Sequence, residues 1–67
     1  MLDLSSNEYF KALSKSIATS DIVKLFDNLL TIATEQEASD IHIEAFETFC
    51  RIRIRIDGIM HELIQYP

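Results

Sequence analysis

The feature that most restricts how this chain can fold is the stretch Arg51-Ile52-Arg53-Ile54-Arg55-Ile56, which the pair Asp57-Gly58 ends. Arginine and isoleucine alternate along it, and a period of two is typical of a strand that buries one face. Asp-Gly between two apolar runs favours a two-residue hairpin loop, because both residues accept a positive φ. The sequence therefore predicts a hairpin with strands at about 50–56 and 59–64, with the isoleucines facing inward and the arginines outward.

The two-residue loop also predicts which residues of the hairpin lie opposite each other. The expected pairs are Ile56–Ile59, Arg55–Met60, Ile54–His61, Arg53–Glu62, Ile52–Leu63 and Arg51–Ile64. Directly opposed charges of opposite sign contribute a few tenths of a kcal/mol, so Arg53 and Glu62 are expected to pair. We expect His61 to be a half-buried core residue, because it lies opposite Ile54.

An earlier segment, Ala38-Ser39-Asp40-Ile41-His42-Ile43-Glu44, also alternates and predicts another strand at about 40–44. Its two isoleucines are expected to point inward, and Asp40, His42 and Glu44 outward. Alternate residues on a strand can supply two metal ligands, but nothing specifies a third, so no metal site is predicted. Asp40 is instead expected to bond the backbone at the start of the strand.

Two helical patterns precede these strands. Ser5 and Glu8 have the spacing of a capping box, which predicts a first helix over about 6–17. Its apolar stripe is thin, so we expect this helix to pack weakly or to serve as a linker arm. Ser20 can cap a second helix over about 21–37, with Asp21 in its first turn. The apolar stripe of that helix consists of Ile22, Phe26, Leu29 and Ala33, widened by Val23, Leu25, Leu30 and Ile32.

These elements predict an α+β fold with two layers, in which two helices accompany a three-stranded, mainly antiparallel sheet. The 67 residues leave room for one domain. The net charge of −5 without a lysine cluster argues against nucleic-acid binding. Cys50 is the single cysteine, which excludes an internal disulfide and fits a reducing cytoplasm. We expect no direct membrane insertion, because no apolar run reaches membrane-spanning length.

The segment Ala38–Glu44 followed by Arg51–Gly58 resembles the secretion ATPase superfamily, the motors of type II secretion and type IV pilus assembly. The resemblance runs from about Asp21 to Gln65. It implies that residues 21–67 begin the PAS-like N-terminal domain of such a motor, a truncated form of that domain, and that residues 1–20 are an N-terminal helix or linker. The sequence departs from the family pattern at three positions, with Glu37 for a helix-ending glycine, Ala45 for a common proline and His61 for a frequent arginine.

The resemblance also implies what the parent motors contain: ATP and Mg²⁺ as cofactors, a RecA-like ATPase domain, neighbouring subunits of a homo-hexamer, and secretion or pilus platform components at the inner membrane. This chain lacks a G-x-x-x-x-G-K-[ST] phosphate loop and a Walker B strand, so by itself it is expected to be non-catalytic and to bind no cofactor. Its expected location is the cytoplasm, or the periphery of the inner membrane through partners.

The candidate site residues are Arg53, Arg55 and Arg51. In the parent family, arginines of the N-terminal domain contact nucleotide or neighbouring subunits, and guanidinium suits both roles because its planar fork binds phosphate or carboxylate at two points. The resemblance thus implies a regulatory segment that senses nucleotide or contacts subunits. Two alternatives stay open: the arginines are a solvated strand face that limits aggregation, or the chain is a stand-alone interaction module that acts through a sheet edge.

Overall fold

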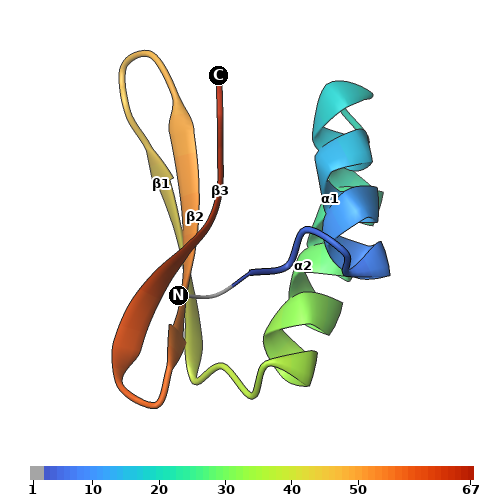
Figure 1. Ribbon diagram of the computed structural model, residues 1–67. Coiled ribbons are helices and arrows are strands. Elements are labelled where there is room, and N and C mark those ends of the chain that lie inside the picture. The colour runs from blue at the N-terminus through green and yellow to red at the C-terminus, as the bar shows by residue number, and fades with distance from the viewer. Residues whose placement is uncertain (1–2) are drawn as a thin grey trace.

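The computed structural model describes residues 3–67, which form two helices packed beside a three-stranded sheet (Figure 1). The elements in chain order are α1 (Glu8–Ala18), α2 (Ile22–Glu35), β1 (Asp40–Ala45), β2 (Cys50–Ile56) and β3 (Ile59–Tyr66). Both strand pairs are antiparallel, and the strand order is β1-β2-β3. The α+β fold expected from the sequence is confirmed. Within residues 3–67, neither helix has the length and apolar character needed to cross a membrane.

Both helices begin one or two residues later than the sequence indicated. Asn7 caps α1, since its Oδ1 accepts hydrogen bonds from the backbone N–H groups of Tyr9 (2.8 Å) and Phe10 (3.1 Å). The expected cap at Ser5 is wrong, because the Asn7 N–H donates to the carbonyl of Leu4 and places Ser5 inside the turn before the helix.

The cap of α2 is Asp21, which accepts from the N–H of Lys24 at 3.1 Å. The expected cap at Ser20 is wrong, because Ser20 has a left-handed backbone with φ of 57° in the connection between the helices.

Glu37 lies just after the end of α2, next to the C-cap residue Gln36. Its φ is 56°, in the left-handed region that favours glycine. The N–H of Ala38 donates to the carbonyl of Ala33 at 2.9 Å, and the N–H of Glu37 donates to Thr34 at 3.1 Å. This is the pattern of a Schellman motif, which satisfies two carbonyls at the end of the helix. The helix therefore ends at Glu35, earlier than the predicted residue 37.

The core lies between the helices and the sheet. Its fully buried side chains are Leu13, Leu29, Ile32, Ile52 and Ile54. Because Leu13 belongs to α1 and is completely buried in the core cluster, the expectation that the first helix packs weakly is wrong. Phe10 and Ile17 flank it against the same cluster.

The buried face of α2 is rotated from the predicted stripe. Leu25, Leu29, Ile32 and Ala33 are buried, whereas Ile22 and Phe26 are 62% and 45% exposed. Ile43 was expected to point inward, and it does share a face with the buried Ile52 opposite it. It is nevertheless 49% exposed, because β1 is an edge strand.

The hairpin of β2 and β3 follows the predicted register near its turn and departs from it further along. Asp57 and Gly58 have positive φ, as the loop requires. The four pairs from Ile56–Ile59 to Arg53–Glu62 are confirmed. Beyond a register shift, the observed pairs are Ile52–Ile64 and Arg51–Gln65, so the predicted pairs Ile52–Leu63 and Arg51–Ile64 are wrong. The bulge leaves Leu63 unpaired on β3, which lets it be buried while Ile64 also packs on the core.

Candidate functional site

The outward face of the sheet carries alternating charged residues of β1 and β2. Arg51, Arg53 and Arg55 alternate with buried isoleucines, so the pleat turns the arginines away from the helices. The antiparallel register places the polar residues of β1 beside them. We call this surface the arginine face; it consists of Asp40, His42, Glu44, Arg51, Arg53 and Arg55.

Glu44 is the centre of one half of the arginine face. Its Oε1 accepts a hydrogen bond from Nε of Arg53 at 2.8 Å and another from Nε of Arg51 at 3.3 Å. The bond from Arg53, helped by Arg51, holds the pKa of the Glu44 carboxyl below its usual value, while partial desolvation opposes this shift. One carboxylate thus fixes two guanidinium groups.

Arg51 has a second support from the loop that joins β1 to β2. Its guanidinium carbon lies 5.1 Å from the centre of the Phe46 ring, a cation–π distance. Phe46 stacks on Phe49 with 4.6 Å between the ring centres, and the N–H of Phe46 donates to the carbonyl of Phe49 at 2.8 Å. Sequence reasoning missed this cluster; two phenylalanines flanking a short connection were the available signal.

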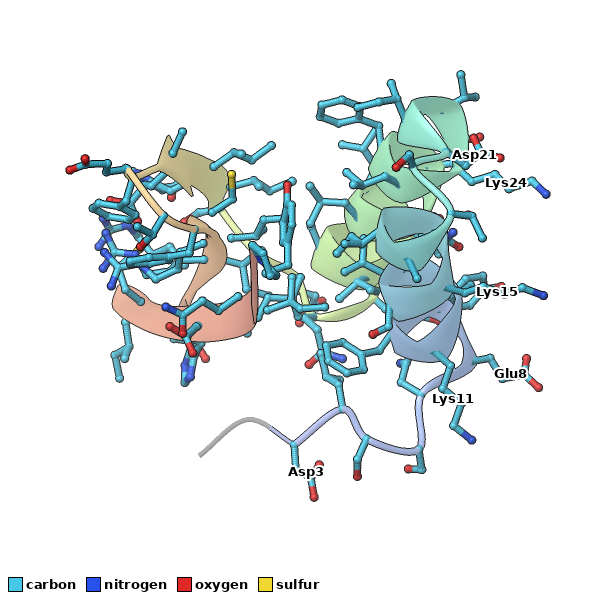
Figure 2. All side chains as sticks on the ribbon, turned by 90° about the horizontal axis from the view of Figure 1, so that it is seen from above. Asp3, Glu8, Lys11, Lys15, Asp21 and Lys24 are labelled. Carbon is cyan, nitrogen blue, oxygen red and sulfur yellow. The ribbon has the colours of Figure 1, made fainter. Side chains whose placement is uncertain are left out.

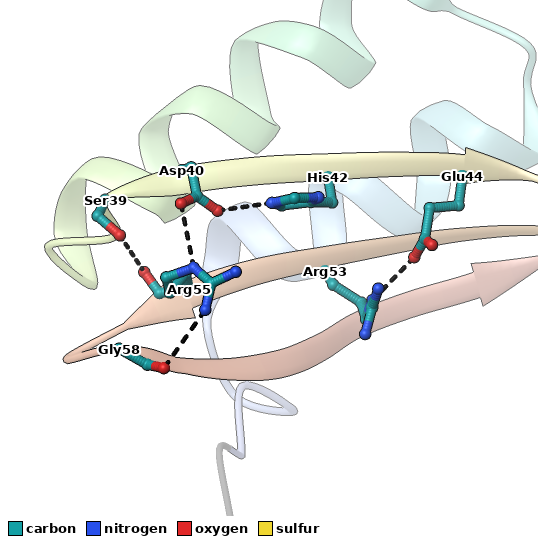
Figure 3. Close-up of polar contacts among 7 residues, drawn as sticks. All are labelled: Ser39, Asp40, His42, Glu44, Arg53, Arg55 and Gly58. Carbon is teal, nitrogen blue, oxygen red and sulfur yellow. Dashed lines mark hydrogen bonds and ion pairs between the residues drawn. The ribbon is translucent and has the colours of Figure 1, made fainter.

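Asp40 is the centre of the other half of the face (Figure 3). Its carboxylate accepts from Nε of Arg55 at 3.2 Å and lies 2.8 Å from Nε2 of His42. Arg55 also donates from Nη1 to the carbonyl of Gly58 at 3.4 Å. The expectation that Asp40 bonds the backbone is wrong. The start of β1 is held instead by the backbone of Ser39, whose N–H donates to the carbonyl of Arg55 at 2.9 Å.

The expected ion pair between Arg53 and Glu62 does not form, although the two residues lie opposite each other. Nε of Arg53 turns to Glu44 on the other neighbouring strand, and Glu62 stays exposed. Within residues 3–67, no hydrogen-bond partner is found for the terminal guanidinium nitrogens of Arg51 and Arg53. These nitrogens, together with Nη2 of Arg55, are donors on the arginine face that can take an anion.

The other residues considered from the sequence lie away from this face. His61 is half-buried opposite Ile54, as expected. Cys50 begins β2 and is a half-buried free thiol. Residues 3–67 contain no group of three His, Cys, Asp or Glu side chains able to hold a metal ion.

The lysines lie on the opposite side of the molecule from the arginines. Figure 2 shows Lys11, Lys15 and Lys24 on the helices, pointing away from the sheet. None of the three forms an ion pair within residues 3–67, whereas each arginine has a carboxylate partner. The outer face of the helices therefore presents lysine ammonium groups, and the outer face of the sheet presents arginine guanidinium groups.

Comparison with known proteins identifies the family of this chain. The family model described as type II/IV secretion system protein matches residues 15–67. The chain belongs to this family. It is 37% identical over 75 residues to the type II secretion system protein E of Aeromonas hydrophila, with 97% of the chain covered. It is 38% identical over 60 residues to the type IV pilus assembly ATPase PilB of Myxococcus xanthus, with 90% covered.

The family members are much longer than this chain. It spans 15% of the Aeromonas protein and 11% of the Myxococcus protein. It spans 8% of the type IV pilus assembly ATPase TfpB of Acinetobacter baylyi, to which it is 48% identical over 46 residues, or 69% of the chain. No solved structure gives a significant match. The sequence-based resemblance to the secretion ATPases is confirmed.

Proposed function

We propose that this chain is a non-catalytic regulatory and interaction segment of a secretion or type IV pilus assembly ATPase. Residues 21–67 would form the start of a PAS-like N-terminal domain, with residues 1–20 as an N-terminal helix or linker. In the full-length hexamer, Arg53, Arg55 and Arg51 would contact nucleotide or a neighbouring subunit. The partners would be the RecA-like ATPase domain, adjacent subunits and inner-membrane platform components, which places the protein in the cytoplasm or at the membrane periphery.

The observation that carries the arginine proposal is the way two guanidinium groups are held. Arg53 and Arg51 use Nε for Glu44, and their terminal nitrogens remain without a partner in residues 3–67. A guanidinium fixed at Nε keeps a two-point donor pair for phosphate or carboxylate oxygens. Arg55 is more fully engaged, by Asp40 and Gly58, so Arg53 is the strongest candidate. We assign no contact with Mg²⁺ to these residues.

The first experiment measures ATP turnover by the 67-residue chain and by a full-length ATPase that carries this segment. The chain alone should release no phosphate from ATP, and measurable turnover would contradict the proposal. In the full-length protein, Arg53→Gln should lower kcat/KM for ATP or reduce the hexamer fraction by about tenfold, as expected for one lost charged contact of about 1.4 kcal/mol. Lys15→Gln removes the same charge from the opposite face and should change either quantity by less than about twofold. Equal effects of the two variants would reject the arginine role.

A second candidate function is a stand-alone interaction module that acts through a sheet edge. Within residues 3–67, β1 and β3 each have one side without a strand partner, which favours this alternative. Light scattering with and without ATP separates the two functions. A tight homodimer at micromolar concentration that does not respond to nucleotide supports the module.

A further inference from the structure

His42 is the residue of the arginine face whose charge can change near neutral pH, because histidine gains or loses its proton between about pH 5 and 8. It lies in the middle of that face, with Asp40 and Glu44 on either side along β1 and Arg53 opposite on β2. Its side chain is 44% exposed, so an ion from solvent can reach it. The charge of the arginine face therefore depends on the protonation of one central side chain.

The contact between His42 and Asp40 determines which ring nitrogen gains the second proton. Nε2 of His42 lies 2.8 Å from Oδ1 of Asp40, while Oδ2 of Asp40 accepts from Nε of Arg55 (Figure 3). Because Nε2 faces a carboxylate, it carries the hydrogen of the neutral ring, and protonation occurs at Nδ1. Within residues 3–67, no hydrogen-bond partner is found for Nδ1. The protonated ring thus gains a positive charge together with an N–H donor that no protein group uses.

The charges that share this face with His42 cancel while the ring is neutral. They come from all three strands and are Asp40, Glu44, Arg51, Arg53, Arg55 and Glu62. The helices cover the other face of the sheet, and beyond β1 no further strand is found in the part of the chain that the structure describes. Three guanidinium groups thus balance three carboxylates, and protonation of His42 makes the face positive.

We propose that His42 is a binding residue of the arginine face, which together with Arg53 takes a doubly charged phosphoryl group and binds it more tightly when the imidazole is protonated. The terminal nitrogens of Arg53 can donate to two oxygens of such a group. Residues directly opposite on antiparallel strands have Cβ atoms about 5 Å apart, so one oxyanion can reach both side chains. This inference rests on the proposed function, to which it adds a further residue and a dependence on pH.

The charge of the ligand favours a phosphoryl group over a carboxylate. Coulomb attraction is proportional to the charge of the anion, so a dianion gains about twice as much from a protonated His42 as a carboxylate does. One added charge roughly 5–7 Å from a dianion at a screened surface should lower Kd by about threefold to tenfold. An effect of this size is measurable with a small oxyanion.

Sulfate is a suitable probe, because it has the shape and charge of a phosphoryl dianion and stays doubly charged throughout the range in which histidine titrates. It is added to the ¹⁵N-labelled 67-residue chain, and the Nε–H resonance of Arg53 reports binding. One titration uses an acidic buffer of about pH 5.5 and the other a neutral buffer of about pH 7.5, at a constant ionic strength of about 0.1 M set with chloride. The wild-type Kd should be about threefold to tenfold lower in the acidic buffer.

Variants of His42 test whether its charge causes the difference. His42→Gln keeps an N–H donor for Asp40 but never becomes charged, so its two Kd values should agree within about 1.5-fold. His42→Lys is charged in both buffers and should bind sulfate about as tightly in the neutral buffer as in the acidic one. His61→Gln is the matched control, since His61 is the chain's other histidine and lies half-buried opposite Ile54. It should keep the wild-type ratio, and circular dichroism checks that each variant stays folded.

The outcomes separate the role of His42 from that of the arginines. Equal wild-type Kd values in the two buffers, a pH dependence that persists in His42→Gln, or one that His61→Gln abolishes would overturn the role of His42. The proposed role of Arg53 stands in each of these cases if Arg53→Gln still weakens sulfate binding in the neutral buffer. Formate that binds more tightly than sulfate would overturn the choice of a phosphoryl group. A wild-type chain that binds no sulfate in either buffer overturns both this inference and the phosphate contact proposed for the arginines.

Discussion

At the scale of single residues, two acids of β1 determine how the arginines of β2 are held. Glu44 receives Nε of Arg51 and Arg53, and Asp40 receives Nε of Arg55. Ion pairs at a surface contribute only about 0–1 kcal/mol each to folding. Their effect here is on orientation, because an arginine anchored at Nε loses less side-chain freedom when its terminal nitrogens bind an anion.

Glu44 should make folding stability depend on acid pH. Its pKa is held below the ordinary value of 4.5, chiefly by the hydrogen bond from Arg53. The stability that a lowered carboxyl pKa contributes is fully present above the unfolded-state pKa and is lost as the pH falls through the folded-state value. Urea unfolding should therefore show the free energy of unfolding falling below pH 4.5. In Glu44→Gln the free energy of unfolding should fall less steeply with decreasing pH. Glu47→Gln, in the adjoining loop, is the control; an unchanged slope in Glu44→Gln would contradict the assignment.

Replacing Glu37 by glycine should stabilise the protein. Its φ of 56° is uncommon for a residue with a side chain, and it completes the Schellman motif. Glu37→Gly should raise the free energy of unfolding by about 0.5–1 kcal/mol, because relief of the left-handed strain of about 1–2 kcal/mol exceeds the entropy cost of glycine. Thermal or urea unfolding measures the change. Lys11→Gly, on an exposed turn inside α1, should lose about 1 kcal/mol, and a loss of that size at residue 37 would refute the argument.

At the scale of elements, the capping residues can be tested directly. Asn7→Ala should destabilise the protein by about 1 kcal/mol, since it removes the acceptor for the N–H groups of Tyr9 and Phe10. Ser5→Ala should be nearly neutral, because Ser5 lies in the preceding turn. Urea midpoints of the two variants decide between these caps. A larger loss in Ser5→Ala would restore the capping box that the sequence suggested.

The elements show which parts of this fold local patterns can predict. The alternation in β2 and the turn at Asp57-Gly58 predicted the hairpin and its first four pairs, because turn geometry fixes register nearby. The bulge at Leu63 escaped prediction, since it depends on whether Leu63 or Ile64 fits the core better. The same holds for α2, where the sequence offered a wide apolar surface and tertiary packing selected the buried part.

At the scale of the whole molecule, the outward orientation of the arginines was predicted from the sequence but their partners were not. Family resemblance and alternation pointed to Arg51, Arg53 and Arg55 on one outward face. Their carboxylate partners on β1 depend on the register of β1 with β2, which a connection of four residues does not specify. The nearest acid by the hairpin register was Glu62, whereas the structure pairs Arg53 with Glu44. Sequence patterns thus predicted the face, and strand pairing decided its electrostatics.

The whole molecule should unfold as one unit, because a single core joins the helices to the sheet. Leu13 of α1 is fully buried in the same cluster as Ile52 and Ile54 of β2. Leu13→Ala should cost about 2–5 kcal/mol and should accelerate amide exchange in β2 by the same free energy as in α1. Tyr9→Ala, at a site on α1 that is 41% exposed, should cost less than about 1 kcal/mol. Hydrogen exchange of the two variants against wild type measures both effects. If β2 amides keep their protection in Leu13→Ala while α1 loses it, the helix is an arm that folds separately, as its thin stripe first suggested.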